Sequence, residues 1–387
     1  MPIPPTAIAT PPDSPMTAVL TNATLVLPDT LLRGTIRMEN GIIVAIDPGR
    51  SSLASAIDCE GDHLLPGAVD LHTDNLERQV QPRAGTRWPG RSAFLAHDAH
   101  CAAAGVTTVL DALCVGDLGF DEDRPRTCAE GIAELGALAP TGLLKAEHYL
   151  HLRCELPAEG MVTLLEPLAT HPMLRLVSLM DHTPGIGQYG DLDRYRAMRW
   201  RDGEPPADTE RRITALQTQR ARLRNENRAA LLRLLRGRVP LASHDDRTHE
   251  EVAENLEDGI ELAEFPVTLE AAAAARTGGQ HIIAGAPNLV RGGSHTGNVA
   301  VSDLLSAALV DALASDYVPC SLIEAAFRSN IQLPQAVALV TDSPARMVGL
   351  LDRGRIDIGL RADLVRVHLH DGAPVVRQVW RQGERVI

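Results

Sequence analysis

The sequence predicts an α/β fold: a (β/α)8 barrel of the TIM type, joined to a small β-sandwich domain built from both chain termini. Three observations support it. Eight short apolar runs of β-type residues recur between residues 66 and 342, helical segments separate these runs, and β-rich stretches flank the region on both sides. Alternating strands and helices favour a parallel sheet, and eight repeats favour its closure into a barrel.

The two ends of the chain have a different character from the middle. Residues 17–65 predict short strands, with a hairpin turn at Glu39-Asn40-Gly41. Further strands are expected at 354–358, 362–369, 375–381 and 384–387. The expected organisation is therefore a proline-rich flexible leader (1–16), a composite domain (17–65 plus 343–387) and a barrel (66–342) with an arginine-rich helical insertion at about 185–238.

The eight apolar runs are short enough to be barrel strands. They lie at residues 68–71, 106–112, 142–152, 174–180, 239–242, 259–263, 281–285 and 310–314.

Composition excludes several classes of protein. The net charge of −13 argues against general nucleic-acid binding. No apolar run approaches the roughly 18 residues that a membrane span needs. The leader lacks the basic and apolar parts of a secretory signal, so a cytoplasmic location is expected. Six scattered cysteines without a CxxC pair argue against a disulfide framework and against a structural zinc knuckle.

Nearly every predicted strand ends in side chains that can carry chemistry. His72 and Asp74 are two residues apart after the first run, so they project to the same side. The later runs end in or are followed by Asp111, His148, His151, Arg153, Glu155, Asp181, His182, His244, Asp245, Asp246, Glu264, Asn288, Arg291, His295 and Asp316. A single histidine at a strand end is usually structural, but the ends of barrel strands meet on one face, and the repetition favours a site.

These residue types predict a divalent metal site with one or two ions, zinc or manganese. Imidazole and carboxylate ligands suit both metals. The expected ligands are His72, Asp74, Glu155, His182, His244 and Asp316. Glu155 is expected to bridge the ions and Asp316 to orient or deprotonate the attacking water, which gives both a catalytic role. Lys145 is a competing bridging ligand, although it lies early in its strand.

The blocks LLPGAVDLHTD and GRIDIGLRADLV, in a barrel with a terminal β-domain, resemble the amidohydrolase superfamily. The usual first motif of that superfamily is His-x-His, and here Asp74 replaces the second histidine. Longer blocks resemble one branch that acts in phosphonate utilisation: VDLHTDNLERQVQPRAGTRWP, LAHDAHCAAAGVTTVLDAL, AEHYLHLRCE, VSLMDHTPGIGQY, SHDD and GAPNLVRGGSHTGN. This resemblance implies hydrolysis of α-D-ribose 1-methylphosphonate 5-triphosphate to the 5-phosphate and pyrophosphate in the carbon–phosphorus lyase pathway.

Arginine-rich segments agree with a phosphate substrate. Residues 194–238 hold thirteen arginines against five acidic residues. A helical lid there could bind polyphosphate, because guanidinium groups match phosphate oxygens. The arginines could instead pair with acids elsewhere or with a partner subunit, which leaves a homodimer open. The preferred substrate-binding residues are Arg78, Arg83, Arg87, Arg291 and His295.

Two other functions remain possible at this point. The superfamily as a whole favours an amidohydrolase or deaminase that acts on a C–N bond. A non-catalytic scaffold subunit of a phosphonate-processing complex would use the basic helical segment as a docking surface, but it has no need for converging histidines and carboxylates.

Overall fold

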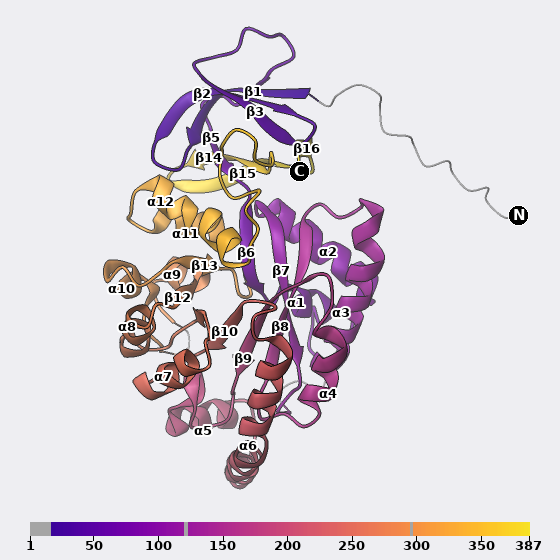
Figure 1. Ribbon diagram of the computed structural model, residues 1–387, viewed down its shortest axis with the longest axis vertical. Coiled ribbons are helices and arrows are strands. Elements are labelled where there is room, and N and C mark those ends of the chain that lie inside the picture. Colours follow the sequence, from indigo (N-terminus) through magenta and orange to yellow (C-terminus); the bar gives the residue numbers. More distant parts are fainter. Residues whose placement is uncertain (1–16, 120–122, 295–296) are drawn as a thin grey trace, which may run out of the picture.

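A computed structural model describes residues 17–119, 123–294 and 297–387 (Figure 1). Eight parallel strands follow one another in chain order and form the barrel sheet. They are β6 (Ala68–Thr73), β7 (Val106–Val115), β8 (Glu147–Glu155), β9 (Leu174–Met180), β10 (Leu241–His244), β11 (Leu262–Glu264), β12 (His281–Gly285) and β13 (Ala312–Ala314). Each overlaps one predicted run, so the predicted barrel is confirmed.

The residues just beyond β6 and β13 close the barrel. The Asp316 N–H donates to the His72 carbonyl at 2.9 Å, and the Asp74 N–H donates to the Asp316 carbonyl at 2.6 Å. Asp70 adds a side-chain link, because its carboxylate accepts from the N–H and the hydroxyl of Ser315. Closure thus places the first and last strands of the predicted site side by side.

Helices separate the strands, as the sequence spacing predicts. The helices are α1 (Asn75–Val80), α2 (Gly90–Ala103), α3 (Arg124–Leu138), α4 (Met161–Leu165), α5 (Leu192–Arg201), α6 (Pro206–Leu235), α7 (His249–Glu257), α8 (Leu269–Thr277), α9 (Ala286–Arg291), α10 (Val301–Ser306), α11 (Ser321–Arg328), α12 (Leu333–Ala338) and α13 (Asp342–Met347). Local chemistry fixes their starts: Thr248 and Glu251 form a capping box at α7, and the Thr268 side chain caps α8. No helix among the described residues is long and apolar enough to cross a membrane.

Both termini contribute to a second, mixed sheet, which confirms the prediction. Its strands are β1 (Thr17–Val26), β2 (Leu31–Glu39), β3 (Ile42–Pro48), β4 (Ile57–Asp58), β5 (His63–Pro66), β14 (Leu364–His370), β15 (Ala373–Arg381) and β16 (Glu384–Arg385). The order β16-β15-β14-β5-β1-β2-β3 forms one hydrogen-bonded path, and β4 pairs with β1. This terminal sheet lies at one end of the molecule (Figure 1).

One predicted strand is wrong. Residues 354–358 form no strand, because the chain turns sharply there to pass the start of α13. Gly354 has φ +86°, and a Cβ on it would lie 2.8 Å from the Thr341 carbonyl oxygen. The predicted leader, residues 1–16, lies outside the described residues.

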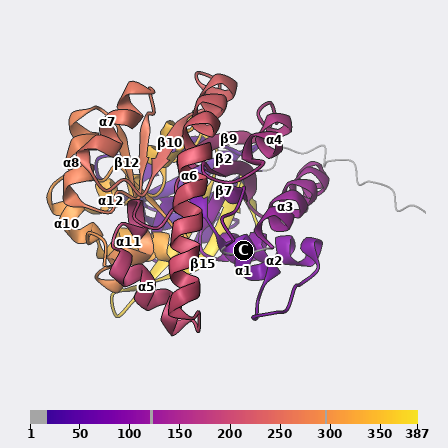
Figure 2. The same cartoon turned by 90° about the horizontal axis from the view of Figure 1, so that it is seen from below.

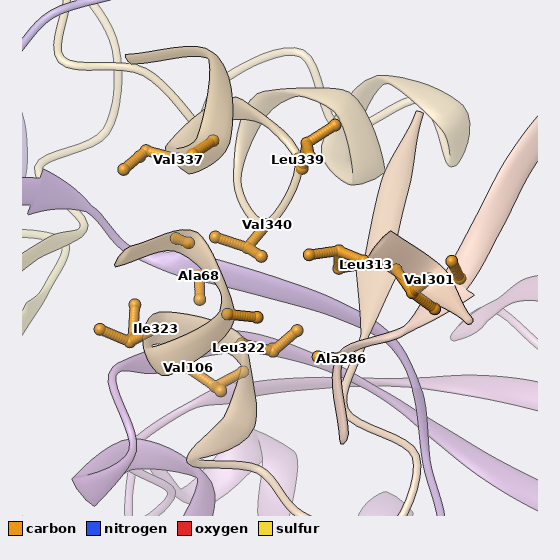
Figure 3. Close-up of a cluster of buried hydrophobic side chains, with 14 of the residues drawn as sticks. Ala68, Val106, Ala286, Val301, Leu313, Leu322, Ile323, Val337, Leu339 and Val340 are labelled. Carbon is orange, nitrogen blue, oxygen red and sulfur yellow. The ribbon is translucent and has the colours of Figure 1, made fainter. Parts of the chain in front are cut away.

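Apolar packing holds the barrel to its outer helices. One buried cluster joins Ala68 and Val106 at the starts of β6 and β7 to Leu322 and Ile323 of α11, and reaches Val340 beyond α12 (Figure 3). Each fully buried Val, Leu or Ile contributes roughly 1.5–3 kcal/mol relative to an exposed one.

Charged side chains occupy the N-terminal end of the barrel. Glu147, the first residue of β8, accepts from Arg353 at 2.6 Å and from Arg361 at 2.5 Å, and both arginines are buried. These ion pairs lie at the N-terminal end of β8. A cavity lies at the opposite, C-terminal end of the strands.

Candidate metal centre and substrate cavity

A cavity of about 310 Å³ lies at the C-terminal ends of the barrel strands. Three histidines and three aspartates line it: His72, His182, His244, Asp74, Asp245 and Asp316. They come from the ends of β6, β9, β10 and β13 or from the residues directly after them. We call these six residues the open cluster.

Carboxylates behind the three imidazoles fix their orientation. The Nδ1 atoms of His72 and His244 lie 2.8 and 2.6 Å from the two oxygens of Glu264. The Nδ1 atom of His182 lies 2.6 Å from Glu155. Because a carboxylate accepts the Nδ1 proton in each case, the Nε2 atom is the one left for the cavity, an arrangement typical of metal-binding histidines.

The Nε2 atoms approach the cavity carboxylates without forming hydrogen bonds to them. His72 Nε2 lies 3.5 Å from Asp74, and His244 and His182 Nε2 lie 3.5 and 3.8 Å from Asp245. His72 Nε2 is buried and has no hydrogen-bond partner. Ligand atoms of His72, Asp74 and Asp316 lie within 4.8 Å of one another, as do those of His182, His244 and Asp245. The unpartnered nitrogen and the donor types fit a divalent cation.

The electrostatics of the open cluster favour positive charge. Burial alone would lower the pKa of His72, but the carboxylates of Glu264 and Asp74 together raise it to about 10. Burial and the neighbouring charge of Asp74 raise the pKa of Asp316 to about 6. Burial opposes ionisation of Asp74, but the Arg153 guanidinium 2.7 Å away holds the pKa of Asp74 below its usual range. In each of these three pKa shifts, a proton or a neighbouring guanidinium compensates the negative charge of the buried carboxylates.

Backbone strain surrounds the cavity. Asp245, Phe265 and Asp316 have φ angles of +59°, +56° and +54°, and all three line the cavity. Asp245 and Phe265 directly follow β10 and β11, and Asp316 lies two residues beyond β13. Left-handed conformations cost non-glycine residues about 1–3 kcal/mol and cluster at functional sites.

Sequence comparison identifies the family. No protein-family model matches the chain. The α-D-ribose 1-methylphosphonate 5-triphosphate diphosphatase of Escherichia coli (strain K12) is 44% identical over 379 residues, covering 95% of this chain and 100% of that protein. The chain belongs to this diphosphatase family.

Solved structures of amidohydrolases share the fold of this chain. A dihydropyrimidinase from Brevibacillus agri NCHU1002 aligns with a TM-score of 0.63 and 14% identity over 96% of this chain and 95% of that one. The N-acetylglucosamine-6-phosphate deacetylase of Pasteurella multocida aligns with a TM-score of 0.60 and 13% identity. The alignment covers 96% of this chain and 99% of the deacetylase. A solved amidohydrolase aligns with a TM-score of 0.56 and 17% identity, and the alignment covers 96% of this chain and 98% of the amidohydrolase. At these identities the likeness concerns the fold.

The structure of this diphosphatase family member gathers five of the six predicted ligands around the cavity: His72, Asp74, His182, His244 and Asp316. Glu155 lies behind them, and its two oxygens accept from His182 Nδ1 at 2.6 Å and from the His182 backbone N–H at 2.9 Å. Lys145 lies at the start of the β8 region, where its Nζ donates to the Val386 carbonyl at 3.4 Å. Lys145 is therefore at the wrong end of the barrel to compete as a ligand.

The predicted substrate-binding residues are more scattered. Arg291 lines the cavity. Arg78 is exposed and donates to the carbonyl of Tyr317, a cavity residue, at 2.7 Å. Arg83 is exposed in the loop that follows α1. Arg87 turns to α3, where it donates to Glu130 at 2.7 Å. His295 lies outside the described residues.

The arginine-rich segment pairs largely with acids of the same chain. Helix α6 packs against the loops that follow β8 and β9 and lies beside α5 (Figures 1 and 2). Arg220 pairs with Asp181 and Arg228 with Asp258, each at 2.6 Å. Other pairs join Arg196 to Glu210, Arg199 and Arg212 to Glu204, Arg222 to Glu159 and Arg224 to Glu254. These ion pairs match the alternative given for the arginine-rich segment, in which its arginines pair with acids elsewhere and do not form a polyphosphate lid.

Four residues important in the geometry received no role from the sequence. Glu264, Asp245 and Arg153 follow from the strand-end pattern, since they end or directly follow a β-run, but the pattern does not distinguish ligands from supports. Arg124, the first residue of α3, also lines the cavity. It belongs to no motif, and only the fold brings it beside β8.

Proposed function

We propose that the chain hydrolyses α-D-ribose 1-methylphosphonate 5-triphosphate to the 5-phosphate and pyrophosphate, in phosphonate catabolism by the carbon–phosphorus lyase pathway. The observation that carries this proposal is the open cluster itself, with a buried, unpartnered His72 Nε2 facing a cavity that guanidinium groups also line. The family relationship supports the choice of substrate, since the relative from Escherichia coli bears this activity in its name.

His72, Asp74, His182, His244 and Asp316 would hold one or two divalent ions, zinc or manganese, and Asp245 joins them. When bound, such an ion acts as a Lewis acid that makes water a better nucleophile and neutralises charge on a phosphoryl group. The donor set supports both metals, because imidazole and carboxylate oxygen are ligands that each accepts.

The carboxylates behind the cluster orient the ligands. Glu264 holds His72 and His244 through their Nδ1 atoms, and Glu155 does the same for His182. We therefore assign Glu155 an orienting role in place of the bridging role expected from the sequence, because both its oxygens already accept from His182. Such supporting hydrogen bonds typically affect metal affinity or activity 10–100-fold.

Asp316 is the proposed proton-handling carboxylate. Its backbone is held between His72 and Asp74 by two hydrogen bonds, which fix the carboxylate beside both side chains. A carboxylate so placed can accept a proton from the attacking water at the cavity wall. Substrate contacts are assigned to Arg291 in the cavity, to Arg78 of α1, which contacts the cavity residue Tyr317, and to Arg83 in the loop after α1. Arg87 instead pairs with Glu130.

Turnover tests the proposal. The purified, metal-loaded protein is incubated with the ribosyl methylphosphonate triphosphate, and phosphorus NMR follows the products. Pyrophosphate release that stops after chelation and returns with added metal is expected. Intact triphosphate in the presence of bound metal would reject the proposal, and parallel assays with dihydrouracil and N-acetylglucosamine 6-phosphate would then test C–N hydrolysis.

The scaffold alternative needs a separate test. His72→Ala removes a proposed ligand without altering the exposed faces of α5 and α6, because His72 is buried in the barrel. Loss of turnover with unchanged recovery of partner proteins from cells grown on phosphonate would separate catalysis from docking. Turnover that survives His72→Ala would reject the proposed centre.

A further inference from the structure

We propose that Arg124 and Arg153 together form the binding site for the phosphoryl chain, and that this site takes inorganic pyrophosphate as its smallest ligand. This proposal rests on the proposed function, because the identity of the triphosphate substrate is taken from it. It assigns the phosphoryl chain to one wall of the cavity.

Arg153 joins the candidate metal centre to the rest of the cavity. It points inward from β8, its side chain is 7% exposed, and its Nη1 donates to Asp74 at 2.7 Å. Its Nε atom is buried and has no hydrogen-bond partner. The Asp74 contact holds the guanidinium beside the open cluster, while the Nε donor is left for a ligand.

Arg124 reaches the same wall from a different element. It begins α3 and lines the same cavity as Arg153. Its Nε forms an ion pair with Glu77 at 3.6 Å, but this distance is too long for a hydrogen bond, and the buried atom has no hydrogen-bond partner. An anion bound between the two guanidinium groups would provide an acceptor for both N–H groups.

Other arginines with an unpartnered Nε do not share this setting. Arg87, Arg224, Arg276 and Arg361 have such an atom, but none lines the cavity. In the described chain, Arg124 and Arg153 combine an unpartnered donor with access to the cavity.

The chemistry of the pair matches a chain of phosphoryl groups. A guanidinium presents its donors in a planar fork that fits two oxygens of one phosphoryl group. With Arg153 beside the open cluster, the phosphoryl group under attack would contact Arg153, and the groups that leave as pyrophosphate would extend toward Arg124. Orthophosphate can occupy only one of the two forks.

Binding measurements on the metal-loaded protein test this assignment. Pyrophosphate and orthophosphate are titrated separately by calorimetry, and metal content is measured before and after because pyrophosphate can remove metal. Arg124→Met is expected to weaken pyrophosphate binding tenfold or more, a typical loss for a charge-assisted pair. Orthophosphate binding should change less. Arg124→Lys, which keeps the charge but loses the fork, should give an intermediate loss.

Arg126→Met is the matched control. Arg126 lies two residues further along α3, is exposed and pairs with Glu130, so its removal changes the same charge without touching the cavity. Its pyrophosphate affinity should stay within about twofold of the parent, as for an exposed pair. Arg153→Met also leaves Asp74 without its partner, so the test is decided on Arg124, with thermal unfolding confirming that each variant is folded.

Pyrophosphate binding that is equal in folded Arg124→Met and in the parent overturns the inference. The readout is independent of turnover. A parent protein that binds pyrophosphate through Arg124 but leaves the ribosyl triphosphate intact would retain the phosphoryl-chain site and reject the proposed function. Normal turnover, together with pyrophosphate binding that does not depend on Arg124, would support the proposed function and reject the phosphoryl-chain site.

Discussion

Two buried groups of histidine and aspartate lie close together in the molecule, and they differ in whether their polar atoms are satisfied. The open cluster faces the cavity. The second group, His97, His148, Asp98 and Asp111, is buried between α2 and the strands β7 and β8, and we call it the closed cluster. Both contain residues whose ligand atoms lie within 4.8 Å of one another.

In the closed cluster every ring nitrogen has a partner. His97 lies 2.6 Å from Asp111 and 2.7 Å from the amide nitrogen of Asn75. His148 lies 3.0 Å from Asp111 and 3.2 Å from Asp98. Because two carboxylates can only accept, His148 must donate from both nitrogens and is a buried imidazolium. The closed cluster is therefore a completed ionic network, whereas the open cluster has an unpartnered His72 Nε2. Residue types alone do not identify a metal site.

Replacement in the open cluster should have the largest effect on activity. His244→Asn removes a proposed ligand from the cavity wall and is expected to lower kcat/KM on the order of 10³-fold, equivalent to about 4 kcal/mol of transition-state stabilisation. The midpoint of thermal unfolding in the metal-free protein should change little. Turnover, bound metal and thermal unfolding are measured on the same preparation, and full activity would remove His244 from the centre.

The same kind of change in the closed cluster should act on stability. Asp111→Asn leaves the His148 imidazolium without one of its two anions, and breaking a buried ion pair typically costs about 3–5 kcal/mol. Urea unfolding measures the loss. Turnover per folded molecule should remain within a few-fold of the parent. A variant that keeps its stability but loses metal would show that the closed cluster is itself a metal site.

The support behind the open cluster should give an intermediate effect. Glu264→Gln keeps the size of the side chain but cannot accept fully charged hydrogen bonds from both His72 and His244. Metal affinity and kcat/KM are expected to fall about 10–100-fold. Competition with a metal indicator measures affinity, and Glu257→Gln, at the end of α7, serves as a control. Equal metal affinity in the parent and in Glu264→Gln would contradict the orienting role.

The His148 imidazolium predicts a pH dependence of stability for the closed cluster. Burial opposes charge on His148, but Asp111 and Asp98 together outweigh burial and raise the pKa of His148 from 6.5 to about 9. The stabilisation from this raised pKa is fully present below pH 6.5 and is lost as pH rises through 9. The difference in unfolding free energy between the parent and His148→Gln should therefore shrink between pH 6.5 and 10. A constant difference would mean that His148 is neutral when folded.

The smallest effect is expected on α6. Arg220→Met breaks a partly exposed pair with Asp181 and should change the unfolding free energy by about 1 kcal/mol at most. Turnover and pyrophosphate affinity should be unchanged, because Arg220 does not line the main cavity. A large loss of affinity would restore the arginine-rich segment as a polyphosphate lid.

The fold could be predicted from the sequence because burial of strands is a local pattern. Each barrel strand is an apolar run, and alternation with helices indicates parallel order. Strand-end chemistry likewise identified His72, His182 and His244, which the structure brings together at the cavity.

The roles of the charged residues depend on partners far away in the sequence. Glu264 lies 192 residues from His72, and Arg87 meets Glu130 43 residues further on. A pattern of charges does not reveal whether a guanidinium already has a carboxylate. For that reason Glu155, Arg87 and the arginines of α6 looked like ligands or substrate contacts, whereas Arg124 did not.

The order of strands in the terminal sheet has a consequence during protein synthesis. Strand β5 lies between β1 and β14, so one edge of β5 has its partner only when residues 364–370 have been made. All eight barrel strands leave the ribosome before that partner. Until then, β5 exposes an unpaired edge, and the core of the terminal sheet lacks Trp380. A nascent or prematurely terminated chain therefore carries a chaperone- and protease-accessible edge that disappears when its C-terminal strands pair.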